Sequence, residues 1–154
     1  MKTLILLVSI TLLVTPSFGQ TLDIQSLKDA YAAWIKAWND RDAAGVAKIS
    51  WGNFGFGRDV PFPRTGVNDP TAYREGIKEY METLTRIDYK EHFTTYEIVN
   101  AVGLVDGFYA QTTQKENGPI RSVYGRQSLV FVRQDDRWKM VHYHRSALPT
   151  EFTR

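Results

Sequence analysis

Apolar side chains recur every three or four residues between residues 23 and 39. The charged side chains of this segment mostly fall between them. The apolar positions are Ile24, Leu27, Tyr31, Trp34, Ile35 and Trp38. This spacing puts them on one stripe and predicts an amphipathic helix. The polar run Asn39-Asp40-Arg41 ends the helix, and Asp42 is a suitable N-cap for a short second helix over residues 43–49.

A segment without any period separates the second helix from a third. Residues 50–68 are rich in glycine, proline and aromatic side chains, and the turn residues argue against a long regular element. We expect the aromatic side chains to fold back as a lid or pocket wall; they are Trp51, Phe54, Phe56 and Phe62. Asp69-Pro70 then supplies a cap and a proline at the first helical position. The apolar stripe that follows predicts a third helix ending near Thr85.

After Arg86 the period changes to two, which is typical of strands. The predicted strands cover residues 87–98, 102–114, 120–133 and 137–146. Lys115-Glu116-Asn117-Gly118 and Gln134-Asp135-Asp136 mark tight turns between them. Short turns between long strands imply an antiparallel meander. The predicted fold class is therefore α+β, with three N-terminal helices packed on a curved antiparallel sheet.

Composition supports a single domain and narrows the possible functions. The chain has 154 residues, of which 43% are hydrophobic and 13% aromatic, enough for one buried core. Its net charge is only +2 and its basic residues are scattered, which argues against a nucleic-acid partner. There is no cysteine, so disulfides, thiolate metal ligands and thiol nucleophiles are excluded.

The N-terminus has the layout of a secretory signal peptide. Lys2 precedes an apolar run from Leu4 to Val14, Pro16 breaks the run, and Ser17-Phe18-Gly19 offers small residues for cleavage. The run is short for a bilayer core of about 30 Å, which disfavours a permanent membrane anchor. We therefore expect a signal peptide at residues 1–19, one domain at residues 20–154, and a secreted or periplasmic protein without stable membrane insertion.

Two histidines stand out near the C-terminus. His142 and His144 are two residues apart on the last predicted strand, so they should leave the same face, together with Trp138 and Met140. On a concave face the two imidazoles could bind an anion or shuttle a proton. On a convex face they would belong to a dimer interface. A metal would need a third ligand, and the third histidine, His92, lies on another strand, so carboxylates would have to complete the set and we expect no metal site. We also expect no cofactor.

Two segments resemble the NTF2-like (SnoaL-like) superfamily. Residues 32–42 look like its opening helix, which ends in Asn-x-x-Asp, here Asn39 to Asp42. Residues 136–149 closely resemble the last strand of the association (hub) domain of calcium/calmodulin-dependent protein kinase II and its bacterial stand-alone relatives. The resemblance implies a cone in which a bent sheet wraps around a long N-terminal helix. Because the superfamily includes isomerases, dehydratases, cyclases and non-catalytic oligomerisation domains, fold alone does not choose a function. No Gly-rich loop or kinase domain is present, so kinase activity is not implied.

The resemblance also suggests individual site residues. Arg121 matches a hub pocket arginine that can receive a carboxylate, whereas a second hub arginine corresponds to Tyr109. In ketosteroid isomerase the oxyanion hole uses a tyrosine and a protonated acid beside a carboxylate base. The helix tyrosine of that family corresponds to Trp34 here, with Tyr31 one turn earlier, and the nearest candidate for the base is Asp59. No carboxylate marks the second acid, so that particular chemistry is not expected.

These observations combine into one expected function with two alternatives. We expect an exported domain, at least dimeric through the outer face of its sheet, that binds a small amphipathic molecule. The acidic or carbonyl group of that molecule would meet Arg121, His142 and His144. Tyr31, Trp34 and Tyr109 are further candidate ligand contacts, although core packing is the stronger explanation for the helix aromatics, since every helix of this kind needs such a stripe. One alternative is a cofactor-independent isomerase, dehydratase or cyclase using histidine or Asp59 as acid or base. The other is a purely structural oligomerisation module.

Overall fold

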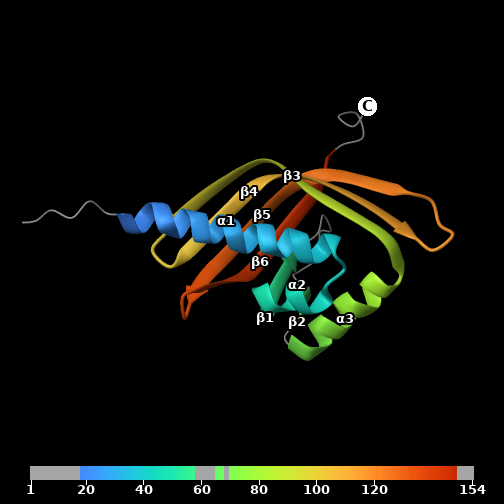
Figure 1. Ribbon diagram of the computed structural model, residues 1–154, viewed down its shortest axis with the longest axis horizontal. Coiled ribbons are helices and arrows are strands. Elements are labelled where there is room, and N and C mark those ends of the chain that lie inside the picture. The colour runs from blue at the N-terminus through green and yellow to red at the C-terminus, as the bar shows by residue number, and fades with distance from the viewer. Residues whose placement is uncertain (1–17, 58–64, 68–69, 149–154) are drawn as a thin grey trace, which may run out of the picture.

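A computed structural model describes residues 18–57, 65–67 and 70–148 (Figure 1). Side chains are described for residues 24–50, 71 and 73–148. The elements in chain order are α1 (Phe18–Asn39), α2 (Ala43–Ile49), β1 (Ser50–Gly57), β2 (Thr65–Val67), α3 (Pro70–Glu82), β3 (Leu84–Val99), β4 (Val102–Lys115), β5 (Arg121–Gln134) and β6 (Arg137–Ala147). The predicted α+β class and the predicted helices and strands are confirmed.

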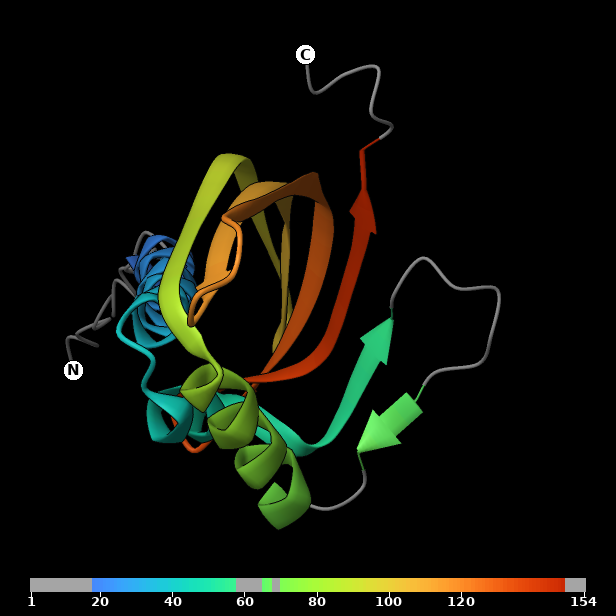
Figure 2. The ribbon, with the colours of Figure 1, turned by 90° about the vertical axis from the view of Figure 1, so that its right-hand side faces the viewer.

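The strands form one curved sheet in the order β2-β1-β6-β5-β4-β3. Strands β3 to β6 are the expected antiparallel meander. Asn117, Asp135 and Asp136 adopt positive φ values of 54°, 48° and 58° in its tight turns, a conformation that Asn and Asp tolerate. Figure 2 shows the sheet curling around an interior, with α1 beside β3 and with α2 and α3 together at the lower end.

The segment after α2 contains a strand that the sequence does not predict. Residues Ser50–Gly57 form β1, which pairs in parallel with β6 through Gly55↔His142 and Phe56↔Tyr143. The expectation of no long regular element is therefore wrong for these residues. The free edge of β6 supplies backbone hydrogen-bonding partners, and that edge is distant in sequence, so local turn propensity is overridden. The aromatic side chains proposed as a lid lie outside the described side chains.

The core lies between α1 and the concave face of the sheet. Leu27, Tyr31 and Trp34 of α1 are fully or almost fully buried and meet inward-facing residues of β4, β5 and β6. Gly103 on β4 allows this close approach, because a Cβ there would sit 2.8 Å from the Cδ atoms of Leu27. The indole nitrogen of Trp138 donates a hydrogen bond to Ser26 Oγ at 2.9 Å, which ties β6 to the first half of α1.

The C-terminal end of α1 is joined to the edge strand β3. The Asn39 side chain donates to the Tyr89 carbonyl at 3.0 Å and accepts from the Tyr89 N–H at 2.6 Å. The Asn39 side chain thus makes the two backbone hydrogen bonds that a residue of a further strand would make at this edge of the sheet. Arg41, at φ 56°, donates to the Leu84 carbonyl at 2.6 Å. Asp42 then caps α2 by accepting from the Gly45 N–H, as its sequence position predicts.

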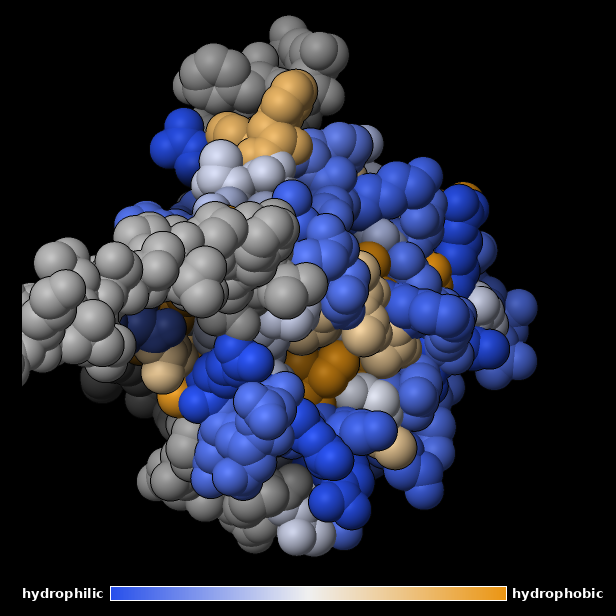
Figure 3. Space-filling view, turned by 60° about the vertical axis from the view of Figure 1, so that its left-hand side comes forward, coloured by the Kyte–Doolittle hydropathy of each residue, from blue (hydrophilic) through white to orange (hydrophobic). Residues whose placement is uncertain are grey.

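The visible surface is mostly hydrophilic. In the view of Figure 3, apolar residues form small patches between hydrophilic ones. Across the described part of the chain, no helix is both long and apolar enough to cross a membrane.

Candidate functional site

A bulge at Val141 decides which side chains of β6 point inward. Phe131 on β5 pairs with Met140, but the next residue, Val130, pairs with His142, so Val141 is an extra residue. An extra residue exchanges the two faces of a strand beyond it. Trp138 and Met140 are buried before the bulge, whereas after it Tyr143 is buried and Arg145 is half-buried on that same concave face.

The two histidines consequently lie on the outer face. They share a face with each other, as expected, but the expectation that Trp138 and Met140 share it too is wrong, because the bulge lies between the pairs. His142 is half-buried beside Val130, and His144 is exposed beside Ser128. The concave face is thereby closed to both imidazoles, and the alternative of an outer-face interface remains.

A chain of hydrogen-bonded side chains crosses the buried interior. Gln127, 2% exposed, lies at its centre and joins α1 to β3, donating from Nε2 to the Tyr31 hydroxyl and accepting at Oε1 from the Tyr89 hydroxyl. The Tyr89 and Tyr143 hydroxyl oxygens are 3.1 Å apart. We call these four residues, Tyr31, Gln127, Tyr89 and Tyr143, the polar chain.

Arg145 stands at the end of the polar chain. Its Nη1 donates to Gln111 Oε1 at 2.8 Å, and its guanidinium carbon lies 5.6 Å from the Tyr109 ring centre and 6.0 Å from that of Tyr143. It also hydrogen-bonds the Tyr143 hydroxyl. Arginine only donates hydrogen bonds, so Tyr143 accepts from it and donates to Tyr89, which donates to Gln127. Because the single hydroxyl hydrogen of Tyr89 is donated to Gln127 Oε1, the hydrogen bonds run in one direction, from Arg145 through Tyr143 and Tyr89 to Gln127.

The tyrosines of the polar chain act as neutral hydroxyls. Burial raises the pKa of Tyr31, and the nearby charge of Glu91 raises it further. Burial likewise raises the pKa of Tyr89 and of Tyr143, although Arg145 opposes the shift at Tyr143. At physiological pH these groups can donate or accept hydrogen bonds, but none is a ready base.

Trp34 packs beneath the polar chain. Its ring meets Tyr143 and Tyr89 edge to face, with centres 5.4 and 5.6 Å away. Its indole nitrogen is buried and has no hydrogen-bond partner within the described part of the chain. Tyr31 and Trp34 are thus interior residues, as both the ligand-contact and core-packing interpretations required.

Arg121 lies apart from Arg145, at the start of β5. Its pairing with Thr113 puts it on the concave side of the strand, but it is exposed because the β4–β5 hairpin extends beyond the core. It lines a separate hollow of about 320 Å³. Tyr109 is buried inside and packs under Arg145. Asp59 lies outside the described residues.

Arg145, Gln111 and Gln127 are polar residues of the concave face that the sequence analysis did not select. Alternation along β4 and β5 puts Gln111 on the same face as Tyr109, and Gln127 on the same face as Leu129, so those two positions carried a readable signal. The sequence carried no such signal for Arg145, because the bulge at Val141 decides which face of β6 Arg145 occupies.

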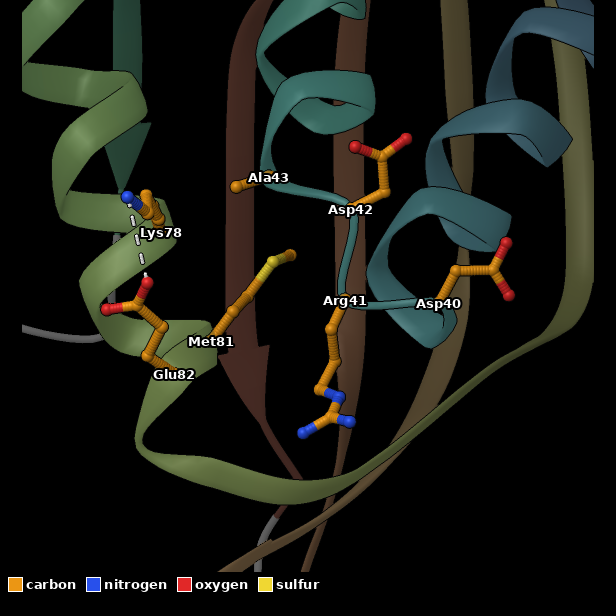
Figure 4. Close-up of a pocket in the computed structure, with 7 residues that line it drawn as sticks. All are labelled: Asp40, Arg41, Asp42, Ala43, Lys78, Met81 and Glu82. Atoms are coloured by element: carbon orange, nitrogen blue, oxygen red, sulfur yellow. Dashed lines mark ion pairs between the residues drawn. The ribbon is translucent and has the colours of Figure 1, made fainter.

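A further hollow, of about 420 Å³, lies between the α1–α2 turn and α3. In Figure 4 the carboxylates of Asp40 and Asp42 point away from α3, while Arg41 extends toward the start of β3. Lys78 and Glu82 form an ion pair of 3.8 Å on α3. These contacts are structural. Nowhere in the described ranges do three His, Asp or Glu side chains gather to hold a metal ion.

The fold and interior together define a conical α+β protein whose sheet, closed by a long helix, encloses a polar chain ending in an arginine. Residues 27–151 match the profile of the SnoaL-like domain. The chain therefore belongs to the SnoaL-like family.

Solved structures show the same fold at low sequence identity. A candidate dehydratase of the NTF2-like family from Streptomyces avermitilis superposes with a TM-score of 0.72 at 14% identity, covering 84% of this chain and 99% of that one. A candidate calcium/calmodulin-dependent protein kinase II association domain from Xanthomonas campestris gives 0.65 at 18% identity, covering 87% and 91%. A candidate scytalone dehydratase from Novosphingobium aromaticivorans gives 0.73 at 11% identity, covering 84% and 87%. Among curated proteins, none matches this chain.

Proposed function

We propose that this protein binds a small amphipathic molecule on the concave face of its sheet, with the acidic or carbonyl group of the molecule against Arg145. The observation that carries this proposal is the position of Arg145, half-buried on the concave face, bonded to Gln111 and stacked near two tyrosine rings. The rings would receive the apolar part of the molecule and the guanidinium its polar end.

Electrostatics favours an acidic group at this position. A partly buried guanidinium loses hydration, and a carboxylate that meets its planar fork through two parallel hydrogen bonds restores much of that loss. Gln111 and Tyr143 hold the guanidinium plane in place, so little side-chain entropy remains to be lost when a ligand binds.

The test measures binding of phenylacetate and of its neutral analogue phenylacetamide by isothermal titration calorimetry, after native mass spectrometry of the purified protein for co-purified acids. Replacing Arg145 with Gln should weaken phenylacetate binding about 10- to 100-fold, the usual contribution of a charge-assisted hydrogen-bond pair. It should weaken phenylacetamide binding much less, because the amide carbonyl carries no charge. Arg137→Gln is the control, since Arg137 is exposed at the β5–β6 turn. Equal phenylacetate affinity in the Arg145 and Arg137 variants would reject the proposal.

Catalysis is the second candidate function, as a cofactor-independent isomerase, dehydratase or cyclase. The position of Arg145 favours it, because a guanidinium on the concave face is suited to stabilising an oxyanion that develops from a ligand carbonyl. The raised pKa values of Tyr89 and Tyr143 exclude them as the base. Because the imidazoles face outward, Asp59 is the proposed base. Asp59→Asn should abolish turnover of the carbonyl substrate but leave phenylacetate binding unchanged.

We also propose self-association through the outer face of the sheet. Phe93, Phe108 and Tyr124 are 88%, 37% and 46% exposed, and Phe93 packs edge-on against Phe108. Phe108 pairs with Arg126, and Asp106 with Ser128, so Asp106 and Arg126 are diagonal neighbours on β4 and β5. A two-fold axis along the other diagonal, from Phe108 to Ser128, brings Asp106 of each copy opposite Arg126 of the other. This self-complementary charge pattern is what a two-fold interface requires.

Export remains part of the proposed function. The sequence of residues 1–19 supports it, and those residues lie at or before the start of the described chain. Expression with the leader in a bacterial host should yield a periplasmic protein whose intact mass corresponds to a chain beginning at Gln20. An unprocessed cytoplasmic protein would contradict it.

A further inference from the structure

The hollow beside Arg121 is a site in its own right, distinct from the position of Arg145. We call it the rim pocket; its residues are Tyr80, Leu84, Thr113, Lys115, Gly118, Pro119 and Arg121. Its volume of about 320 Å³ is within the range of small-molecule sites. Strand pairing brings its residues together, because Leu84 on β3 pairs with Lys115 on β4, and Thr113 on β4 pairs with Arg121 on β5.

The rim pocket carries two positive charges and no carboxylate among its lining residues. Buried Leu84 forms an apolar part of its wall, and Tyr80 of α3 another part. By contrast, the hollow between the α1–α2 turn and α3 is lined by Asp40, Asp42 and Glu82 as well as by two cations. The rim pocket is therefore the more strongly cationic of the two.

Neither cation of the rim pocket is neutralised by a neighbour. Arg86 and Lys90 both pair with Asp88, and Lys78 pairs with Glu82. Within the described ranges, Lys115 and Arg121 have no such ion pair, and the half-buried Thr113 hydroxyl has no hydrogen-bond partner. Two like charges that share one hollow repel each other, and an anion between them removes that repulsion.

The hydrogen-bond donors that line the rim pocket are suited to binding an oxyanion. The Gly118 N–H already donates to the Lys115 carbonyl at 3.0 Å, and proline has no N–H. The side-chain donors of the rim pocket are therefore the Arg121 guanidinium, the Lys115 ammonium and the hydroxyls of Thr113 and Tyr80. A guanidinium and an ammonium together recognise an oxyanion with several acceptor oxygens.

We propose that the rim pocket binds an oxyanion, the shared chemistry of phosphate and carboxylate groups. The anion has two possible sources. It is either a separate small anion or the second acidic end of the molecule whose first end meets Arg145; only the second source rests on the proposed function. Gln111, which holds Arg145, precedes Thr113 by two residues on one strand, so the two sites are about 7 Å apart along β4. A short linear dicarboxylate can span that distance.

The test uses inorganic phosphate and adipate as probes, followed by amide chemical shifts and calorimetry at constant ionic strength. Phosphate should shift the amides of Thr113, Lys115 and Arg121. Arg121→Gln and Lys115→Gln should each weaken phosphate binding about tenfold. Lys78→Gln is the matched control, because it removes one positive charge from the opposite side of α3. All three positions are exposed, and thermal unfolding checks that each variant folds.

Arg145→Gln separates the two sources and separates this proposal from the proposed function. The phosphate-induced shifts of the Thr113, Lys115 and Arg121 amides should persist in it, whatever happens to phenylacetate. If adipate loses affinity in both the Arg145 and Arg121 variants, one dianion spans the two sites; if it loses affinity only in the Arg121 variant, the rim pocket takes a separate anion. Equal phosphate affinity in the Arg121, Lys115 and Lys78 variants, or shifts spread evenly over all lysines, would overturn the rim pocket as an anion site.

Discussion

Gln127 is the central residue of the polar chain. Among the residues that the structure describes, it is the link between the hydroxyl of Tyr31 on α1 and that of Tyr89 on β3. An amide can serve both neighbours because it offers a donor and an acceptor at once. A buried hydroxyl that loses its partner costs about 1–3 kcal/mol.

We expect Gln127→Leu to lower the free energy of unfolding by about 2–4 kcal/mol, since two buried hydroxyls lose a partner while side-chain volume is nearly kept. Urea denaturation followed by tryptophan fluorescence measures this. Gln134→Leu at the exposed end of β5 should change stability by less than about 0.5 kcal/mol. Similar stabilities for the two variants would show that the hydrogen bonds of Gln127 contribute nothing net.

At the scale of elements, the join between α1 and β3 rests on Asn39. Its side chain satisfies both backbone groups of Tyr89 on the free edge of β3. The two ends of the Asn-x-x-Asp pattern thus have different structural roles. Asn39 hydrogen-bonds the backbone at the free edge of β3, and Asp42 caps α2.

We expect Asn39→Ala to destabilise the protein by about 1–3 kcal/mol, because two backbone groups lose their partner. It should also accelerate amide hydrogen exchange at Tyr89 more than elsewhere in β3. The neighbouring Asp40→Ala removes only an exposed ion pair with Lys36 and should cost no more than about 1 kcal/mol. Unchanged exchange at Tyr89 in the Asn39 variant would refute the role of the side chain at the edge.

The element scale also shows where sequence reasoning succeeded and failed. The three helices, the four long strands and their tight turns follow from periodicity and turn chemistry, because each depends on residues close together in the chain. The inward face of β6 could not be inferred. Val141 looks like any other strand residue, and its bulge arises only from the pairing of β6 with β5.

At the scale of the whole molecule, the outer face of the sheet is the proposed surface of self-association. Aromatic side chains exposed there would be a liability on a monomer, whereas in the proposed dimer Asp106 of each copy would face Arg126 of the other. The interior and the outer face are separate, so ligand binding and self-association can be tested independently.

We expect Asp106→Lys to raise the dimer dissociation constant at least about tenfold. A lysine at position 106 of each copy would then face Arg126 of the other copy, and the two cations repel each other. The double variant Asp106→Lys with Arg126→Glu should restore association by exchanging the signs. Light scattering after size-exclusion chromatography measures both. Glu116→Lys makes the same charge change in the exposed β4–β5 turn and should leave the dimer intact. A double variant no better than the single one would refute the proposed pairing.

The amino-acid sequence alone determined the fold class, the extent of the main elements and the aromatic stripe of α1, because these depend on periodicity and on local turn and capping chemistry. Only the tertiary structure decided that β1 lies parallel to β6, that Arg145 faces inward, and that His142 and His144 face outward. The physical reason is that strand pairing joins residues far apart in the chain. One extra residue in such a pairing exchanges the faces of the strand beyond it while leaving the local sequence pattern unremarkable.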